Sequence, residues 1–293
     1  MTITDGFSSE IGSLRAGPFD LGYRIEGNGM PVLIVGSAIY YPRTFSRALR
    51  EKLRLIFIDH RGFAPARATF AAADIGFDTV LDDIERMRVH LGLERFAVLG
   101  HSGHGYMALE YAKRQPQHVS HVVMVGTGPS HSLAHLTLAD RLWEETAAPE
   151  RKAIFDKEMS ELASDIAARP DERFKSLLIR LGAKSWHQPD FDASALWRGV
   201  TVNNPVFDHL WGETFRDIDI RKHLNALTAP VLLALGRSDY LVAPASTWDE
   251  YRADFTDLTV RMFEKSGHTP QLEESALFDE VLLSFLNPGN VRA

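Results

Sequence analysis

Several short apolar runs divide the chain at intervals. They do not alternate with polar residues, and most are rich in Val, Ile and Leu, which is typical of strands buried on both faces of a sheet. Between two pairs of runs, apolar residues recur at helical spacing, over 77–91 and over 105–115. The runs occupy residues 31–36, 53–59, 95–100, 120–126 and 230–236. Strand, helix, strand in this order predicts a parallel sheet with right-handed crossovers.

The pattern changes between residues 129 and 213, where only helical periodicity is found. Prolines divide this region into separate helices, at Pro149, Pro170, Pro189 and Pro205. A crossover between parallel strands needs about a dozen residues, and this region is much longer. We therefore predict a helical cap at 129–213, inserted into an α/β core formed by 1–128 and 214–293. A set of ordinary crossover helices is the alternative.

One serine lies where a predicted strand ends and a predicted helix begins, in the segment GHSGHG (100–105). A tight turn of this kind strains its central residue, Ser102, and leaves room only for small neighbours. The helix that follows directs its N-terminal amides at any charge developing on the serine oxygen. The usual Gly-x-Ser-x-Gly spacing is not met, because His104 stands in place of the second glycine. On its own, the segment fits either a nucleophile elbow or a structural turn, and we expect His101 and His104 to have structural roles.

Two further groups follow late strands in the order that a Ser, acid, His triad requires. Asp239 comes after the run at 230–236, and His268 comes after a sixth apolar run near residue 260. The three features together strengthen the interpretation of Ser102 as a nucleophile.

With the motifs GHSG, LGRSDYLVAP and SGHTPQLEE, the chain resembles the α/β-hydrolase superfamily over nearly its full length, and most of all its proline iminopeptidase-like branch. The resemblance implies a mostly parallel eight-stranded sheet with helices on both faces and a helical cap. It implies that Ser102 is the nucleophile, His268 the base and then the acid, and Asp239 the carboxylate that orients His268. It also implies an oxyanion hole made by the backbone N–H groups of Gly103 and Ser37, with Ala38 as an alternative to Ser37. In the same resemblance, Asp59 and Arg61 form a turn that shapes the loops around the pocket.

These features predict a hydrolase that cleaves a small ester or amide through an acyl-enzyme. A proline iminopeptidase-like aminopeptidase and a carboxylesterase or lactonase both remain open, since the chain has Val35-Gly36-Ser37 where iminopeptidases carry a longer glycine-rich run. A cofactor-free, non-hydrolytic enzyme and a ligand receptor on the same scaffold are further alternatives. We expect Tyr40 and Trp211 to contact substrate, and Glu213 to be the cap carboxylate that would hold a substrate amine.

Composition narrows the partners. The net charge of −7 and the lack of a Lys/Arg stripe argue against nucleic acid, so we expect a small molecule or short peptide as substrate. Cysteine is absent and the 12 histidines form no metal-binding spacing, so we expect no metal and no cofactor. No apolar run reaches 18 residues, and the first twelve residues lack the features of a leader, so we expect a cytoplasmic protein without a membrane span. The oligomeric state stays open.

Overall fold

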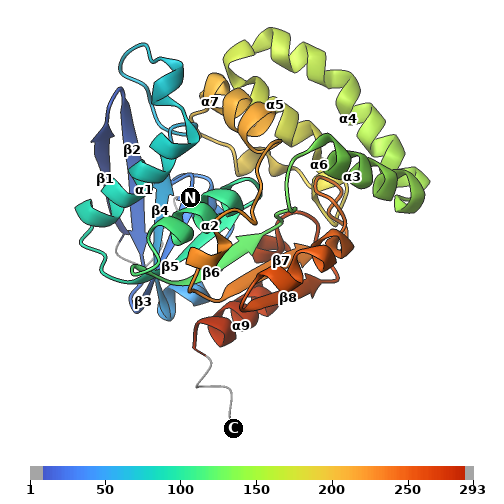
Figure 1. Ribbon diagram of the computed structural model, residues 1–293. Coiled ribbons are helices and arrows are strands. Elements are labelled where there is room, and N and C mark those ends of the chain that lie inside the picture. The colour runs from blue at the N-terminus through green and yellow to red at the C-terminus, as the bar shows by residue number, and fades with distance from the viewer. Residues whose placement is uncertain (1–8, 288–293) are drawn as a thin grey trace.

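The structure, a computed structural model, describes residues 9–287. Its centre is an eight-stranded sheet in the order β1-β2-β4-β3-β5-β6-β7-β8 (Figure 1). Only β1 and β2 run antiparallel to their neighbours, and all other pairs are parallel. The strands are β1 (Ser9–Ala16), β2 (Phe19–Glu26), β3 (Met30–Gly36), β4 (Leu53–Asp59), β5 (Phe96–His101), β6 (Val119–Val125), β7 (Val231–Gly236) and β8 (Leu258–Phe263). The predicted mostly parallel sheet is confirmed.

Helices cover both faces of the sheet, as the unalternating apolar runs require. Along β3, Leu33 and Val35 belong to one apolar cluster, which contains the buried side chains of α1 (Phe77–His90) and α2 (His104–Arg114). Val32 and Ile34 belong to a second cluster, which contains Phe278, Leu282 and Leu286 of α9 (Ser275–Leu286). Successive residues of one strand thus serve opposite cores.

The region between β6 and β7 is helical, and we refer to residues 129–213 as the cap. In Figure 1 its helices gather at the top, beyond one end of the sheet. They are α3 (Leu133–Thr146), α4 (Pro149–Ala168), α5 (Arg173–Arg180), α6 (Gly182–Ser185) and α7 (Asn204–His209). Pro149 and Pro205 each lie in the first turn of a helix, where the missing N–H removes no hydrogen bond. After the cap and β7 come α8 (Pro270–Glu273) and α9.

Residues 1–8, which make up most of the segment used for the expectation about a leader, lie outside the described residues. Within residues 9–287, no helix has the length and apolar character needed to cross a membrane.

Candidate active site

Ser102 lies in a sharp turn between β5 and α2, in a backbone conformation that serine rarely adopts. Its φ is +59°, in the left-handed region. The Ser102 N–H donates to the Val125 carbonyl at 2.7 Å, and the Ser102 carbonyl accepts from the Gly105 N–H and from Thr127 Oγ1, both at 2.9 Å. Because both backbone polar groups are held, the strained turn is fixed by its surroundings.

Two of the glycines in this turn are required by close approach. A Cβ on Gly100 would overlap the carbonyl oxygen of His104, so the strand and the helix could not pack. A Cβ on Gly103 would lie 2.6 Å from the ring of Trp211. The cap therefore comes down directly onto the residue after Ser102.

Asp239 and His268, 29 positions apart, form a buried pair. His268 Nδ1 lies 2.7 Å from Asp239 Oδ2, and Asp239 Oδ1 accepts from the Leu241 N–H at 2.9 Å. The exposed fractions of the two side chains are 9% for His268 and 3% for Asp239. With Nδ1–H donating to the carboxylate, the neutral imidazole keeps the lone pair of Nε2 available as a base.

The cap contributes backbone contacts to this pair through residues 184–187, which we call the anchor segment. The Ser185 carbonyl accepts from the His268 N–H at 2.5 Å, and the Lys184 carbonyl accepts from the Tyr240 N–H at 3.0 Å. The buried carboxylate of Glu273 accepts the N–H of His187 at 2.6 Å, together with those of Gly267 and Thr269. Loops that carry the acid and the imidazole are thus both bonded to the cap.

The loop after β3 places Ser37 beside the turn. The Ser37 hydroxyl accepts the N–H groups of Ile39 and Tyr40, which closes the loop upon itself. The Ala38 N–H donates to Asp59 Oδ1 at 2.7 Å, so it is not free for a ligand. Burial raises the pKa of Asp59 to about 7, against the opposing effect of the N–H groups that it accepts. No acceptor among residues 9–287 takes the N–H of Ser37 or that of Gly103.

One cavity of about 370 Å³ opens onto Ser102 and His268. No Asp, Glu, Lys or Arg within the described residues lines it, and its walls are mainly aromatic and aliphatic. The apolar wall comes from both core and cap: Tyr40, Tyr41, Phe63, Leu136, Phe174, Leu177, Leu178, Leu181, Trp186, Ala193, Trp197, Phe207, Trp211, Leu241 and Val242. Such a cavity suits a small organic group without charge.

The structure brings most of the predicted site residues together, with one exception. Tyr40 and Trp211 line the cavity beside Ser102. Glu213 does not, because its side chain is 73% exposed and pairs with His209 at 2.9 Å. The sequence also gave no reason to choose His131, which lines the cavity from the loop after β6. Burial is the main cause that lowers the pKa of His131 to about 4, which keeps this side chain neutral at pH 7.

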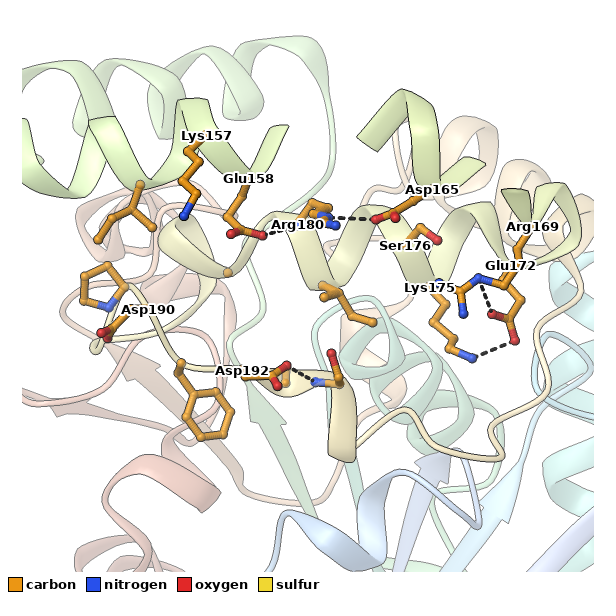
Figure 2. Close-up of a pocket in the computed structure, with 17 residues that line it drawn as sticks. Lys157, Glu158, Asp165, Arg169, Glu172, Lys175, Ser176, Arg180, Asp190 and Asp192 are labelled. Atoms are coloured by element: carbon orange, nitrogen blue, oxygen red, sulfur yellow. Dashed lines mark hydrogen bonds and ion pairs between the residues drawn. The ribbon is translucent and has the colours of Figure 1, made fainter. Parts of the chain in front are cut away.

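A second cavity, of about 380 Å³, lies within the cap between α4, α5 and the loop at 189–194. Figure 2 shows that its charged side chains largely face one another. Arg180 pairs with Glu158 at 2.6 Å and with Asp165 at 2.7 Å, and Lys175 pairs with Glu172 at 2.7 Å. These pairs fasten α4 to α5, whose opposite face lines the first cavity. Over the part of the chain that is described, no group of three or more His, Cys, Asp or Glu side chains could hold a metal ion.

Comparisons with known proteins agree with this architecture. The family model for the alpha/beta hydrolase fold matches residues 27–275. The AB hydrolase superfamily protein YclE of Bacillus subtilis is 46% identical over 269 residues, covering 92% of this chain and 96% of that protein. The proline iminopeptidase PfmaB of Pestalotiopsis fici is 26% identical, covering 81% of this chain and 83% of its own. Among solved structures, the proline iminopeptidase of Mycobacterium smegmatis superposes with a TM-score of 0.71 at 20% identity, over 95% of this chain and 98% of the other. At that identity, the superposition speaks for the fold alone.

Proposed function

This chain belongs to the α/β-hydrolase family and is a hydrolase, and from that premise we propose that it cleaves a small, neutral ester through an acyl-enzyme formed on Ser102. The observation that carries the proposal is the buried bond between Asp239 and His268, in a cavity that both Ser102 and His268 line. A serine hydroxyl is a weak nucleophile at neutral pH and needs an adjacent base. His268, fixed by Asp239, is that base.

In the first half-reaction, His268 Nε2 takes the proton of the Ser102 hydroxyl while the serine oxygen bonds to the ester carbonyl carbon. The carbonyl oxygen becomes an oxyanion, and the N–H groups of Gly103 and Ser37 donate to it. The tetrahedral intermediate then breaks its bond to the alcohol oxygen, which receives the proton from His268. Asp239 stabilises the transient imidazolium.

In the second half-reaction, water replaces the alcohol. His268 takes a proton from the water as its oxygen attacks the acyl carbon, and later returns a proton to the Ser102 oxygen as the acid leaves. The N-terminal end of α2 points at this site, and its dipole favours the negative oxygen in both steps.

The lining of the cavity favours an ester over a peptide with a free amino terminus. A substrate ammonium group taken out of water needs a carboxylate partner. No Asp or Glu of the described chain lines the cavity, and Glu213 points elsewhere. The proline iminopeptidases among the relatives support the aminopeptidase as a second candidate, since their names specify that activity.

Labelling with a fluorophosphonate probe and an ester assay test the nucleophile. The wild type and Ser160→Ala, which alters an exposed serine of α4, should both be labelled and active. Ser102→Ala and His268→Ala should each lose about 10⁴-fold or more in ester turnover, because the three groups act as a unit. Equal activity in Ser102→Ala would remove the acyl-enzyme from consideration, and a wild type that never reacts with the probe would favour a receptor or a non-hydrolytic enzyme.

A substrate panel tests the choice between ester and peptide. We expect p-nitrophenyl esters of apolar acids to be hydrolysed with a higher kcat/KM than the arylamides of proline or alanine. A preference for the proline arylamide would instead identify an aminopeptidase.

A further inference from the structure

We propose that four buried residues, His60, Tyr41, His104 and His101, form a hydrogen-bonded network with one fixed direction, and that this network positions His268. The network explains why a histidine stands at 104, where the elbow motif normally has glycine. Its role in catalysis rests on the proposed function, but the network itself does not. All four side chains are buried.

Each of the three imidazoles in the network is bonded to one backbone group that can act in only one way. The Gly62 N–H can only donate, and it lies 3.0 Å from His60 Nδ1, so that nitrogen carries a lone pair. The carbonyl of His101 can only accept, and it lies 2.8 Å from His104 Nδ1, so that nitrogen carries a proton. The carbonyl of His268 can only accept, and it lies 2.7 Å from His101 Nε2, so that nitrogen also carries a proton.

The remaining contacts fit these assignments without conflict. His60 Nε2–H donates to the lone pair of His104 Nε2 at 3.1 Å. The Tyr41 hydroxyl lies 3.0 Å from His104 Nδ1 and 3.2 Å from His101 Nδ1, so it accepts from the first and donates to the second. Every proton in the network therefore has an acceptor, and the chain of donors runs from Gly62 to the carbonyl of His268.

The network requires that all three imidazoles be neutral. A second proton on His104 would place N–H against N–H between His104 and His60. Burial disfavours that proton, since it lowers the pKa of His104 to about 4 and holds the pKa values of His60 and His101 well below their usual range. Tyr41 stays a phenol, because burial raises its pKa well above its usual value.

The consequence for catalysis lies in the backbone of His268. Its carbonyl is held by His101, and its N–H is held by the Ser185 carbonyl of the anchor segment. Peptide groups on both sides of the His268 Cα are thus fixed, while the ring is fixed by Asp239. Without the Tyr41 hydroxyl, His101 could shift its proton to Nδ1 and turn a lone pair towards the His268 carbonyl, which would repel the loop that carries the base. Tyr41, His104 and His60 are accordingly positioning residues.

Nitrogen NMR tests the direction of the network without any turnover measurement. The protein is labelled with ¹⁵N-histidine, long-range ¹H–¹⁵N spectra are recorded at pH 7, and each ring is assigned by its loss in a single His→Gln variant. We expect His60 and His101 as Nε2–H tautomers and His104 as the Nδ1–H tautomer, all neutral. The opposite tautomer at any of the three, or a charged imidazole among them, overturns the network, whether or not Ser102 is the nucleophile.

Kinetics of Tyr41→Phe test the positioning role. Since a misplaced base slows the chemical step, we expect kcat to fall at least tenfold, on the order of the cost of small displacements, with KM within about twofold of the wild type. Tyr111→Phe is the matched control, because it removes another buried tyrosine hydroxyl bond, to Glu85 at 2.7 Å, away from the cavity. A kcat for Tyr41→Phe within twofold of the control overturns the role.

Discussion

Replacing His104 by glutamine should make the protein less sensitive to acid. His104 is surrounded by Tyr41, His60 and His101, and Coulomb repulsion from His268 adds to burial in lowering its pKa from 6.5 to about 4. As the pH falls, the unfolded chain binds a proton at this residue near pH 6.5, and the folded protein does so only near pH 4. Stability is therefore lost as the pH falls through this window, since the unfolded state binds more protons.

The size of the effect follows from the two pKa values. A shift of this size makes the contribution of His104 close to zero at pH 7 and unfavourable to the folded state by about 2 kcal/mol at pH 5. The free energy of unfolding can be measured with urea and tryptophan fluorescence at both pH values. We expect the wild type to lose about 2 kcal/mol more than His104→Gln between pH 7 and pH 5.

The comparison uses the difference between two pH values, so a constant loss of stability from the substitution cancels. His90→Gln, which removes an exposed imidazole at the end of α1, is the control. Losses for His104→Gln and the wild type that agree within about 0.5 kcal/mol would refute a buried, neutral His104.

Three further substitutions test other parts of the site. Glu273→Gln replaces a carboxylate that accepts three backbone N–H groups, so we expect an unsatisfied buried donor, a cost of about 1–3 kcal/mol in urea unfolding and a lower kcat. Unchanged values of both would mean that the carboxylate does not hold the loop. Glu213→Gln should leave kcat/KM for esters within twofold of the wild type, given its exposure, whereas a tenfold loss would assign it to substrate binding. Gly103→Ala brings a methyl group against Trp211, and we expect about 1–3 kcal/mol of destabilisation by thermal unfolding, which an unshifted midpoint would contradict.

The central strands could be predicted from the sequence because burial on both faces leaves a continuous apolar run. The first two strands could not, since they form a hairpin at the edge of the sheet. The residues of β1 alternate between exposed and partly buried, and only Ala16 at its end is buried. Exposed edges of this kind carry a weak pattern that a turn or an irregular segment also shows.

In the site, Ser102, Asp239 and His268 could be chosen because each follows a strand, and parallel strands end at the same edge of the sheet. The histidine network could not be predicted, because His104 bonds to residues 44 and 63 positions earlier in the chain. The cavity wall from α5 was equally out of reach. Its leucines lie on one face of an amphipathic helix, and that spacing does not distinguish a core from a cavity.

The anchor segment at 184–187 has a consequence for how such an enzyme can acquire new substrates. A cap that rests on the core only through side chains could be exchanged for another without disturbing the chemistry. Here the backbone of the cap is bonded to the loops of both Asp239 and His268, so a foreign cap would have to reproduce those bonds before it could offer a new cavity. Divergence of substrate range is therefore easiest at α5 and α7, whose side chains shape the cavity without carrying the machinery.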